Sequence, residues 1–125
     1  MREATVLLVE DDPTVAEIYR LALERARYVV VIARDGIECL ESVAAQPPDF
    51  IFMDIRMPRM DGMQALRELN ARQAVPPVVM LSNFDDPALI RESRTLGAKD
   101  YIVKAGMNPG ELPAIVARWV DRGAA

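Results

Sequence analysis

Charged side chains follow several short apolar runs that lie far apart in this sequence. Glu10, Asp11 and Asp12 come after the first run, Asp54 after a central run, and Lys104 after the last one. If these runs are parallel strands of one sheet, all of these charges emerge at the same edge. In open α/β sheets, ligands and reacting groups gather at the carboxyl ends of the strands. A carboxylate cluster with one ammonium at such an edge indicates a divalent metal and a phosphoryl group.

Carboxylates brought this close together need a cation. Two of them about 4 Å apart repel by about 1 kcal/mol in bulk water and by about 4 kcal/mol at an effective dielectric of 20. Mg²⁺ is the natural candidate, because it binds oxygen ligands and commonly uses one or two carboxylates plus a phosphate oxygen. With the metal masking negative charge, Asp54 can attack phosphorus and hold an acyl phosphate. Lys104 and the Ser82 hydroxyl would share the phosphoryl oxygens, so catalysis is mostly positioning and charge neutralisation.

The composition argues against several other functions. The chain has 15 Lys plus Arg against 19 Asp plus Glu, a net charge of -4, and no basic stretch, so direct nucleic-acid binding is not expected. The absence of histidine excludes Ser-His-Asp and Cys-His nucleophile pairs and His-ligated zinc. Cys39 is the single cysteine and cannot form an internal disulfide. Its apolar neighbours predict a half-buried, unreactive thiol.

From this sequence we expect neither a signal peptide nor a membrane-spanning segment. Its amino terminus turns at once into a strand-like segment, and its uncharged apolar runs are far shorter than the roughly 20 residues that cross a bilayer. We therefore expect a cytoplasmic protein with no membrane association. A chain of 125 residues suffices for one buried core but not for two, which predicts one domain over 1–125.

Apolar runs and helical stripes alternate five times along the chain. The predicted strands are Thr5–Val9, Tyr28–Ala33, Asp49–Met53, Pro77–Leu81 and Lys99–Val103, and the predicted helices are about 14–26, 36–45, 63–73, 87–97 and 109–121. Continuous apolar strands imply a sheet that is covered on both faces. With the right-handed crossover rule, this pattern predicts a three-layer, doubly wound α/β fold.

Local signals support these helix boundaries. Asp12 followed by Pro13 predicts a helix cap and the first helical residue, and Gly97 predicts a helix stop. The last predicted helix carries Leu112, Ile115, Val116 and Trp119 on one apolar stripe with helical spacing.

Taken together, the charged residues and the segments around them resemble the receiver domain of two-component response regulators over essentially the whole chain. The matching segments are 9–12, 53–62, 81–82 and 97–104. Each is a modest signal alone, but their order and spacing are highly specific. The resemblance implies a flavodoxin-like (βα)5 fold with a five-stranded parallel sheet of order 2-1-3-4-5.

The resemblance also implies a metal-dependent phosphoacceptor site. By similarity, Asp54 is the residue that becomes an aspartyl phosphate. Asp11 and Asp12 hold Mg²⁺ together with Asp54 and the backbone carbonyl of Arg56. A domain of this family is a signalling module that assists its own phosphorylation and dephosphorylation, and is not a conventional enzyme.

A second set of residues is implied to carry the signal onward. Ser82 contacts the phosphoryl group, Lys104 couples it to the last strand, and Tyr101 occupies the rotamer-switch position. The expected partner is a sensor histidine kinase or a histidine phosphotransfer protein, which donates from a phosphohistidine. Phosphorylation is expected to change the 87–121 face, through which a homodimer is plausible.

Two residues depart from the usual family pattern. The family lysine is normally followed by proline in a cis peptide, whereas Lys104 precedes Ala105. A cis bond before a residue other than proline costs about 3–4 kcal/mol, which favours a trans peptide here. Asn83 follows Ser82 where many members have a smaller residue, so the lifetime of the acyl phosphate could differ.

Several alternatives stay open from the sequence alone. A pseudo-receiver would keep the fold and bind partners without being phosphorylated. A flavoprotein is disfavoured because the acidic segment after the first strand would repel a flavin phosphate, and an aspartate-nucleophile phosphatase needs two acids two residues apart. Asp12 is also what a helix cap alone would require, and Tyr101 also suits a half-buried strand position.

Overall fold

The computed structural model describes residues 3–73 and 75–120, and within these residues the chain forms one sheet of five parallel strands with connecting helices. The strands are β1 (Thr5–Val9), β2 (Val29–Ala33), β3 (Phe50–Asp54), β4 (Val78–Ser82) and β5 (Asp100–Val103). Their order is β2-β1-β3-β4-β5, and each adjacent pair is parallel. The predicted fold class and strand order are therefore confirmed.

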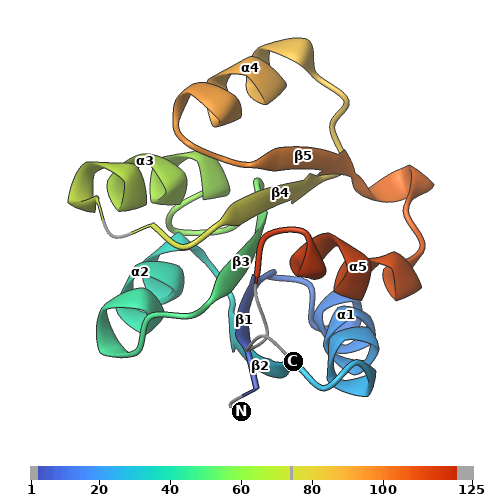
Figure 1. Ribbon diagram of the computed structural model, residues 1–125. Coiled ribbons are helices and arrows are strands. Elements are labelled where there is room, and N and C mark those ends of the chain that lie inside the picture. Colours follow the sequence, from blue (N-terminus) through green and yellow to red (C-terminus); the bar gives the residue numbers. More distant parts are fainter. Residues whose placement is uncertain (1–2, 74, 121–125) are drawn as a thin grey trace.

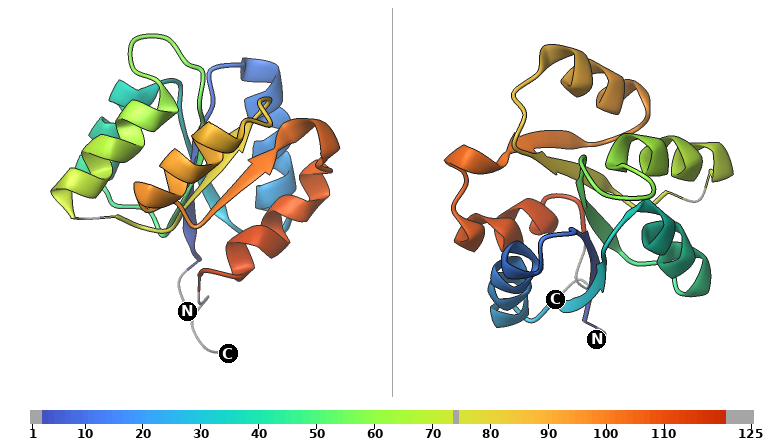
Figure 2. Two further views of the ribbon diagram at one scale, coloured as in Figure 1. Left: turned by 90° about the horizontal axis from the view of Figure 1, so that it is seen from above. Right: turned by 180° about the vertical axis from the view of Figure 1, so that it is seen from behind.

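Helices cover both faces of this sheet (Figure 1). They are α1 (Pro13–Arg25), α2 (Gly36–Ala45), α3 (Gly62–Arg72), α4 (Pro87–Thr95) and α5 (Leu112–Ala117), with short 3₁₀ turns η1 (Lys104–Gly106) and η2 (Pro109–Glu111) before α5. α1 and α5 pack on one face, and α2 and α3 pack on the other, as the two views of Figure 2 also show. α4 lies beside β5, and its Leu89 packs against the cluster under α2 and α3. Helices on both faces of the sheet give the fold three layers.

The core follows from the two-residue period of the strands. Successive side chains point to opposite faces, so one strand supplies both layers. Leu7 and Met53 belong to the cluster under α2 and α3, whereas Leu8 and Phe52 belong to the cluster under α1 and α5. Every residue of β3 and β4 is buried. Each large apolar side chain buried in this way contributes about 1.5–3 kcal/mol.

Four helices begin with an aspartate cap at the same edge of the sheet. The carboxylates of Asp12, Asp35, Asp61 and Asp86 accept backbone N–H groups in the first turns of α1, α2, α3 and α4. Such a cap contributes about 1 kcal/mol because it satisfies an amide that the helix leaves unpaired. Helices with defined starts hold the loops at this edge in fixed positions.

The last helix is shorter than the sequence predicts. In place of one helix over 109–121, η2 precedes an α5 that ends at Ala117, and residue 121 lies outside the described residues. Trp119, expected on the stripe of the longer helix, lies beyond the end of α5, and its side chain is 41% exposed. The ammonium of Lys99 lies 5.9 Å from the centre of its ring.

Two further local predictions have clear outcomes. Cys39 is fully buried rather than half-buried, and this burial raises the pKa of its thiol to about 12. The stop at Gly97 is confirmed, because α4 ends at Thr95 and Gly97 has a φ of 101°, which favours glycine.

Within the described residues no helix has both the length and the apolar character needed to span a bilayer.

Candidate functional site

Parallel pairing brings the ends of three strands together and places their charged residues in contact. Glu10 directly follows β1, Asp54 ends β3, and Lys104 directly follows β5. The Lys104 Nζ atom lies 2.6 Å from Glu10 Oε1 and 3.3 Å from Asp54 Oδ2. The side chains of Glu10 and Lys104 are only 3% and 10% exposed, so water screens this arrangement weakly.

Burial and charge act in opposite directions on these groups. Burial raises the pKa of Glu10 above its usual value, and the hydrogen bond from Lys104 offsets part of that increase. Burial disfavours the charged form of Lys104, but its contacts with Glu10 and Asp54 together outweigh this effect and raise the Lys104 pKa. Lys104 is therefore a persistent cation between two carboxylates.

Glu10, Asp11 and Asp54 form a set of ligands suited to a metal ion. One carboxylate oxygen from each lies within 4.8 Å of the other two. This set consists only of oxygen donors, which suits a hard cation such as Mg²⁺ better than zinc, which favours nitrogen and sulfur ligands. Asp11 is exposed while the other two are buried, so the cluster opens to solvent on one side.

Asp12, a predicted metal ligand, lies elsewhere in this arrangement. Its Oδ1 atom accepts the backbone N–H groups of Thr14 at 2.9 Å and Val15 at 3.2 Å, which makes it the cap of α1. Sequence reasoning did not assign Glu10 a role, although it is the first residue after β1 and its carboxylate joins the cluster. The Asp12-Pro13 pair could have identified Glu10, because it assigns Asp12 to the cap of the helix and leaves Glu10 and Asp11 as the acids available to the cluster.

The carboxylate of Asp54 is oriented from two sides. Its Oδ1 atom accepts the backbone N–H of Ile55 at 2.8 Å, and its Oδ2 atom faces Lys104. Two residues further on, Arg56 places its guanidinium carbon 4.7 Å from the centre of the Phe84 ring. The role of the Arg56 carbonyl as a metal ligand stays a prediction.

Ser82 and Tyr101 are joined through the backbone of Phe84. Ser82 is buried at the end of β4, and its Oγ accepts the Phe84 N–H at 3.0 Å. The Tyr101 hydroxyl donates to the Phe84 carbonyl at 2.5 Å. A displacement of the segment after β4 would therefore reach both predicted switch residues.

Glu10 and Asp11 of the cluster line a surface depression that the two residues departing from the family pattern also line. Asn83 and Ala105 border it together with Lys104 and the start of α1. Among the described residues there is no cis peptide bond, so the Lys104–Ala105 bond is trans, as the replacement of proline favours.

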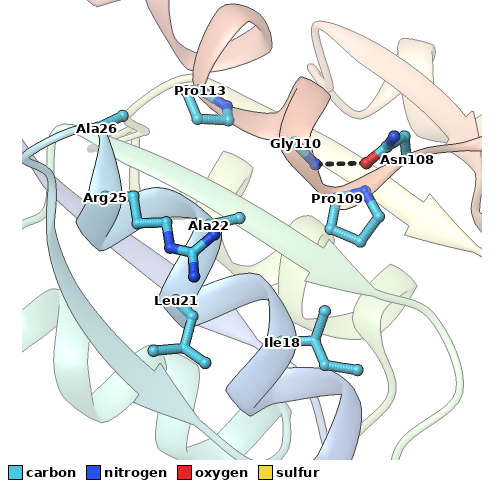
Figure 3. A pocket seen from close by; sticks show the side chains of 9 residues that line it. All are labelled: Ile18, Leu21, Ala22, Arg25, Ala26, Asn108, Pro109, Gly110 and Pro113. Carbon is cyan, nitrogen blue, oxygen red and sulfur yellow. Dashed lines mark hydrogen bonds between the residues drawn. The ribbon is translucent and has the colours of Figure 1, made fainter.

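A second, more apolar groove lies between α1 and the segment that contains η2 and the start of α5. Figure 3 shows Ile18, Leu21 and Ala22 of α1 facing Pro109 and Pro113, with Arg25 at one end. The Gly110 N–H donates to the Asn108 side chain at 2.9 Å and holds the opposite wall of the groove. Ile18 and Leu21 are 47% and 45% exposed.

Comparison with known families identifies this combination of fold and charged residues. The sequence profile of the response regulator receiver domain matches residues 6–117. The chain belongs to this family. The resemblance seen in the sequence is thereby confirmed, and this receiver domain is a signalling domain of the two-component type.

Relatives of this receiver domain include two bacterial regulators. Over 113 residues it is 34% identical to the response regulator MprA of Mycobacterium ulcerans, covering 90% of this chain and 47% of that protein. Over 117 residues it is 32% identical to the alkaline phosphatase synthesis transcriptional regulatory protein PhoP of Bacillus subtilis, covering 94% and 48%. The chain thus spans about half the length of the curated relatives it matches.

Solved structures of receiver domains have the same fold. The receiver domain of the Francisella response regulator 1452 superposes with a TM-score of 0.88 at 28% identity, covering 94% of this chain and 96% of that one. The chemotaxis protein CheY4 of Vibrio cholerae superposes with a TM-score of 0.87 at 28% identity, covering 95% and 100%.

Proposed function

We propose that this receiver domain accepts a phosphoryl group from a phosphohistidine of a partner histidine kinase or phosphotransfer protein onto Asp54. The observation that carries the proposal is the contact of Lys104, whose side chain is 10% exposed, with Asp54 Oδ2 at 3.3 Å, beside a cluster of carboxylate oxygens. The carboxylate supplies the nucleophile, and the ammonium supplies positive charge where the phosphoryl oxygens would lie.

In the proposed reaction, a carboxylate oxygen of Asp54 bonds to phosphorus while the bond from phosphorus to the donor imidazole nitrogen breaks. The electrons of that bond stay on the imidazole, which then takes up a proton. Glu10, Asp11 and Asp54 would hold Mg²⁺, with the Arg56 carbonyl as a further ligand, and the metal would neutralise charge on the phosphoryl oxygens. Lys104 and the Ser82 hydroxyl complete the set of groups around those oxygens.

The proposed output is a change in the 87–121 face. A phosphoryl group on Asp54 carries about two negative charges and strong acceptor oxygens, where the free carboxylate carried one charge. These oxygens attract Ser82 and Lys104. Movement of Ser82 disturbs the hydrogen bond that its Oγ accepts from the Phe84 N–H, and the carbonyl of Phe84 accepts the hydrogen bond from the Tyr101 hydroxyl. We propose that the resulting shift of α4 and β5 alters contacts with partners, including a second copy of this domain.

Phosphorylation by a small donor tests the acceptor directly. Acetyl phosphate with Mg²⁺ should add one phosphoryl group to the wild-type protein, read by intact mass, because the site itself supplies most of the catalytic groups. Asp54→Asn should abolish the adduct. Asp61→Asn is the matched control, because Asp61 ends the same loop but caps α3, and asparagine is also a good cap. An adduct that survives in Asp54→Asn, or none in the wild type with any donor, would favour the pseudo-receiver.

A metal-binding experiment distinguishes the proposed roles of Asp11 and Asp12. Mg²⁺ should raise the melting temperature of the wild type by mass action. Asp11→Asn should remove most of this shift, because Asp11 belongs to the oxygen cluster. Asp12→Ala should cost about 1 kcal/mol of stability as a lost cap but keep the shift. If Asp12→Ala loses the shift while Asp11→Asn keeps it, the ligand set predicted from the sequence is favoured over the cluster seen in the structure.

A further inference from the structure

The loop between β3 and α3, residues 55–61, is tied to the neighbouring turn by an ion pair. The Arg59 Nε atom donates to Asp35 Oδ2 at 2.7 Å, and Arg59 Nη2 lies 3.8 Å from Glu38 Oε2. The Asp35 side chain is only 6% exposed, whereas that of Arg59 is 55% exposed. The hydrogen bond from Arg59 and that from the Glu38 amide hold the pKa of Asp35 below its usual value.

Arg59 adopts a backbone conformation that needs such support. Its φ is 63°, in the left-handed region, which is unfavourable for a residue with a Cβ. Next to it, the Met60 carbonyl accepts the Gly36 N–H at 2.9 Å. A Cβ on Gly36 would lie 2.7 Å from the Met60 oxygen, so the two backbones are in direct contact.

The same loop orients Asp54. The Gly62 N–H donates to the Ile55 carbonyl at 2.7 Å and closes the base of the loop. The Ile55 N–H in turn donates to Asp54 Oδ1 at 2.8 Å, which leaves Oδ2 facing Lys104. A continuous series of contacts therefore runs from Asp35 through the loop to the carboxylate of Asp54.

We propose that the Asp35–Arg59 ion pair is a positioning device that holds the 55–61 loop and thereby the Asp54 carboxylate. The proposal rests on the proposed function, because it assigns these two residues a role in preparing Asp54 for metal and phosphoryl group. Neither residue belongs to the oxygen cluster formed by Glu10, Asp11 and Asp54. Asp35 and Arg59 act through Ile55, and their effect should appear as a change in the order of the loop.

The variants isolate the ion pair from the helix cap. Asp35→Asn removes the charge but keeps a side-chain oxygen for the Glu38 amide, because asparagine caps as well as aspartate. Arg59→Gln removes the other charge. The matched control is Arg67→Gln, because Arg67 is equally exposed at 55% and pairs with Glu92 at 2.8 Å, away from the loop.

The first readout is amide hydrogen exchange in metal-free protein. At Ile55 and Gly62, exchange should be about tenfold faster in Asp35→Asn and in Arg59→Gln, and unchanged in Arg67→Gln. The double variant should be no faster than either single variant, because partners in one interaction are not additive. Unchanged exchange at these amides would overturn the proposal, whatever the effect on melting temperature.

The second readout is Mg²⁺ affinity, measured by titration of the wild type and the same variants. Groups that orient metal ligands typically change affinity by 10–100-fold when removed, and for this more distant pair we expect about tenfold weaker binding. Faster exchange with unchanged Mg²⁺ affinity would reduce the pair to a structural contact and overturn the positioning role. If the wild type itself binds no Mg²⁺ and accepts no phosphoryl group, the proposed function fails. Amide hydrogen exchange still tests whether the Asp35–Arg59 ion pair holds the 55–61 loop.

Discussion

The acidic cluster of Glu10, Asp11 and Asp54 includes two buried residues, whereas the α4–β5 edge is mostly half-buried or exposed, although both regions belong to one sheet. Around the cluster, Glu10 is 3% exposed and Asp54 is 9% exposed, and both contact Lys104. At the other edge every residue of β5 is only half-buried. In α4 only Ser93 is fully buried, and an exposed ion pair between Arg67 and Glu92 links this helix to α3.

This difference in burial is what the proposed output through the 87–121 face requires. Buried, paired charges hold one geometry, because separating them leaves an uncompensated charge in a low dielectric. A helix with few buried contacts can shift at low cost, and regions of low local stability are those that move in switching proteins. A two-state element of this kind needs its alternative form within a few kcal/mol. Under the proposed function, the α4–β5 edge is the part expected to move, because its residues are less buried than Glu10 and Asp54.

The largest effect should come from breaking the buried ion pair. Lys104→Met leaves Glu10 buried without its cation, which should cost about 3–5 kcal/mol in urea unfolding near neutral pH. Without the hydrogen bond that lowers it, the pKa of Glu10 should rise further above its usual value of 4.5. A raised folded-state pKa contributes stability that is present below the unfolded value and is lost as the pH rises through the folded value. The deficit should therefore be smaller at about pH 5 than at about pH 8.

A second substitution provides the control for this result. In the double variant Glu10→Gln with Lys104→Met, no unpaired glutamate charge remains, so part of the lost stability should return and much of the pH dependence should disappear. A Lys104→Met deficit that is below about 1 kcal/mol and independent of pH would show that the cluster is no more tightly held than an exposed pair.

The next largest effect should come from the close approach of Gly62 to the backbone of Asp54. A Cβ on Gly62 would lie 2.0 Å from the Asp54 carbonyl oxygen, so Gly62→Ala should cost about 1–3 kcal/mol or more through a forced backbone shift. Gly106→Ala is the matched control, because a Cβ there would meet nothing within 4 Å. Chemical denaturation should show a large loss for the first and little change for the second. Equal losses would contradict the close approach of Gly62 to the Asp54 backbone.

The smallest effect is expected at the α4 side. Glu92→Gln removes the exposed ion pair to Arg67, and exposed pairs typically contribute about 0.2–1 kcal/mol. The unfolding free energy should fall by no more than this, and the difference should shrink further in high salt because exposed charges are screened. A loss comparable with that of Lys104→Met would show that α4 is firmly anchored.

Much of this architecture was predictable from the sequence because its signals are local. Strand and helix periods, aspartate caps and the Gly97 stop depend on neighbouring residues, and they place the five strands within a residue or two of the structure. The resemblance to receiver domains supplied the strand order. Asp54 and Lys104 could be assigned to one edge because parallel strands must present their carboxyl ends on the same side.

Tertiary structure decided what depends on direction and distance. Which of three consecutive acids joins the cluster is set by where β1 ends and by Pro13, which turns Asp12 into a helix cap and leaves Glu10 to face Lys104. The pairing of Asp35 with Arg59 joins residues from two different loops, and neither local pattern indicates the other. A sequence determines which residues can carry charge at an edge, but only the packed chain determines which of their oxygen and nitrogen atoms meet.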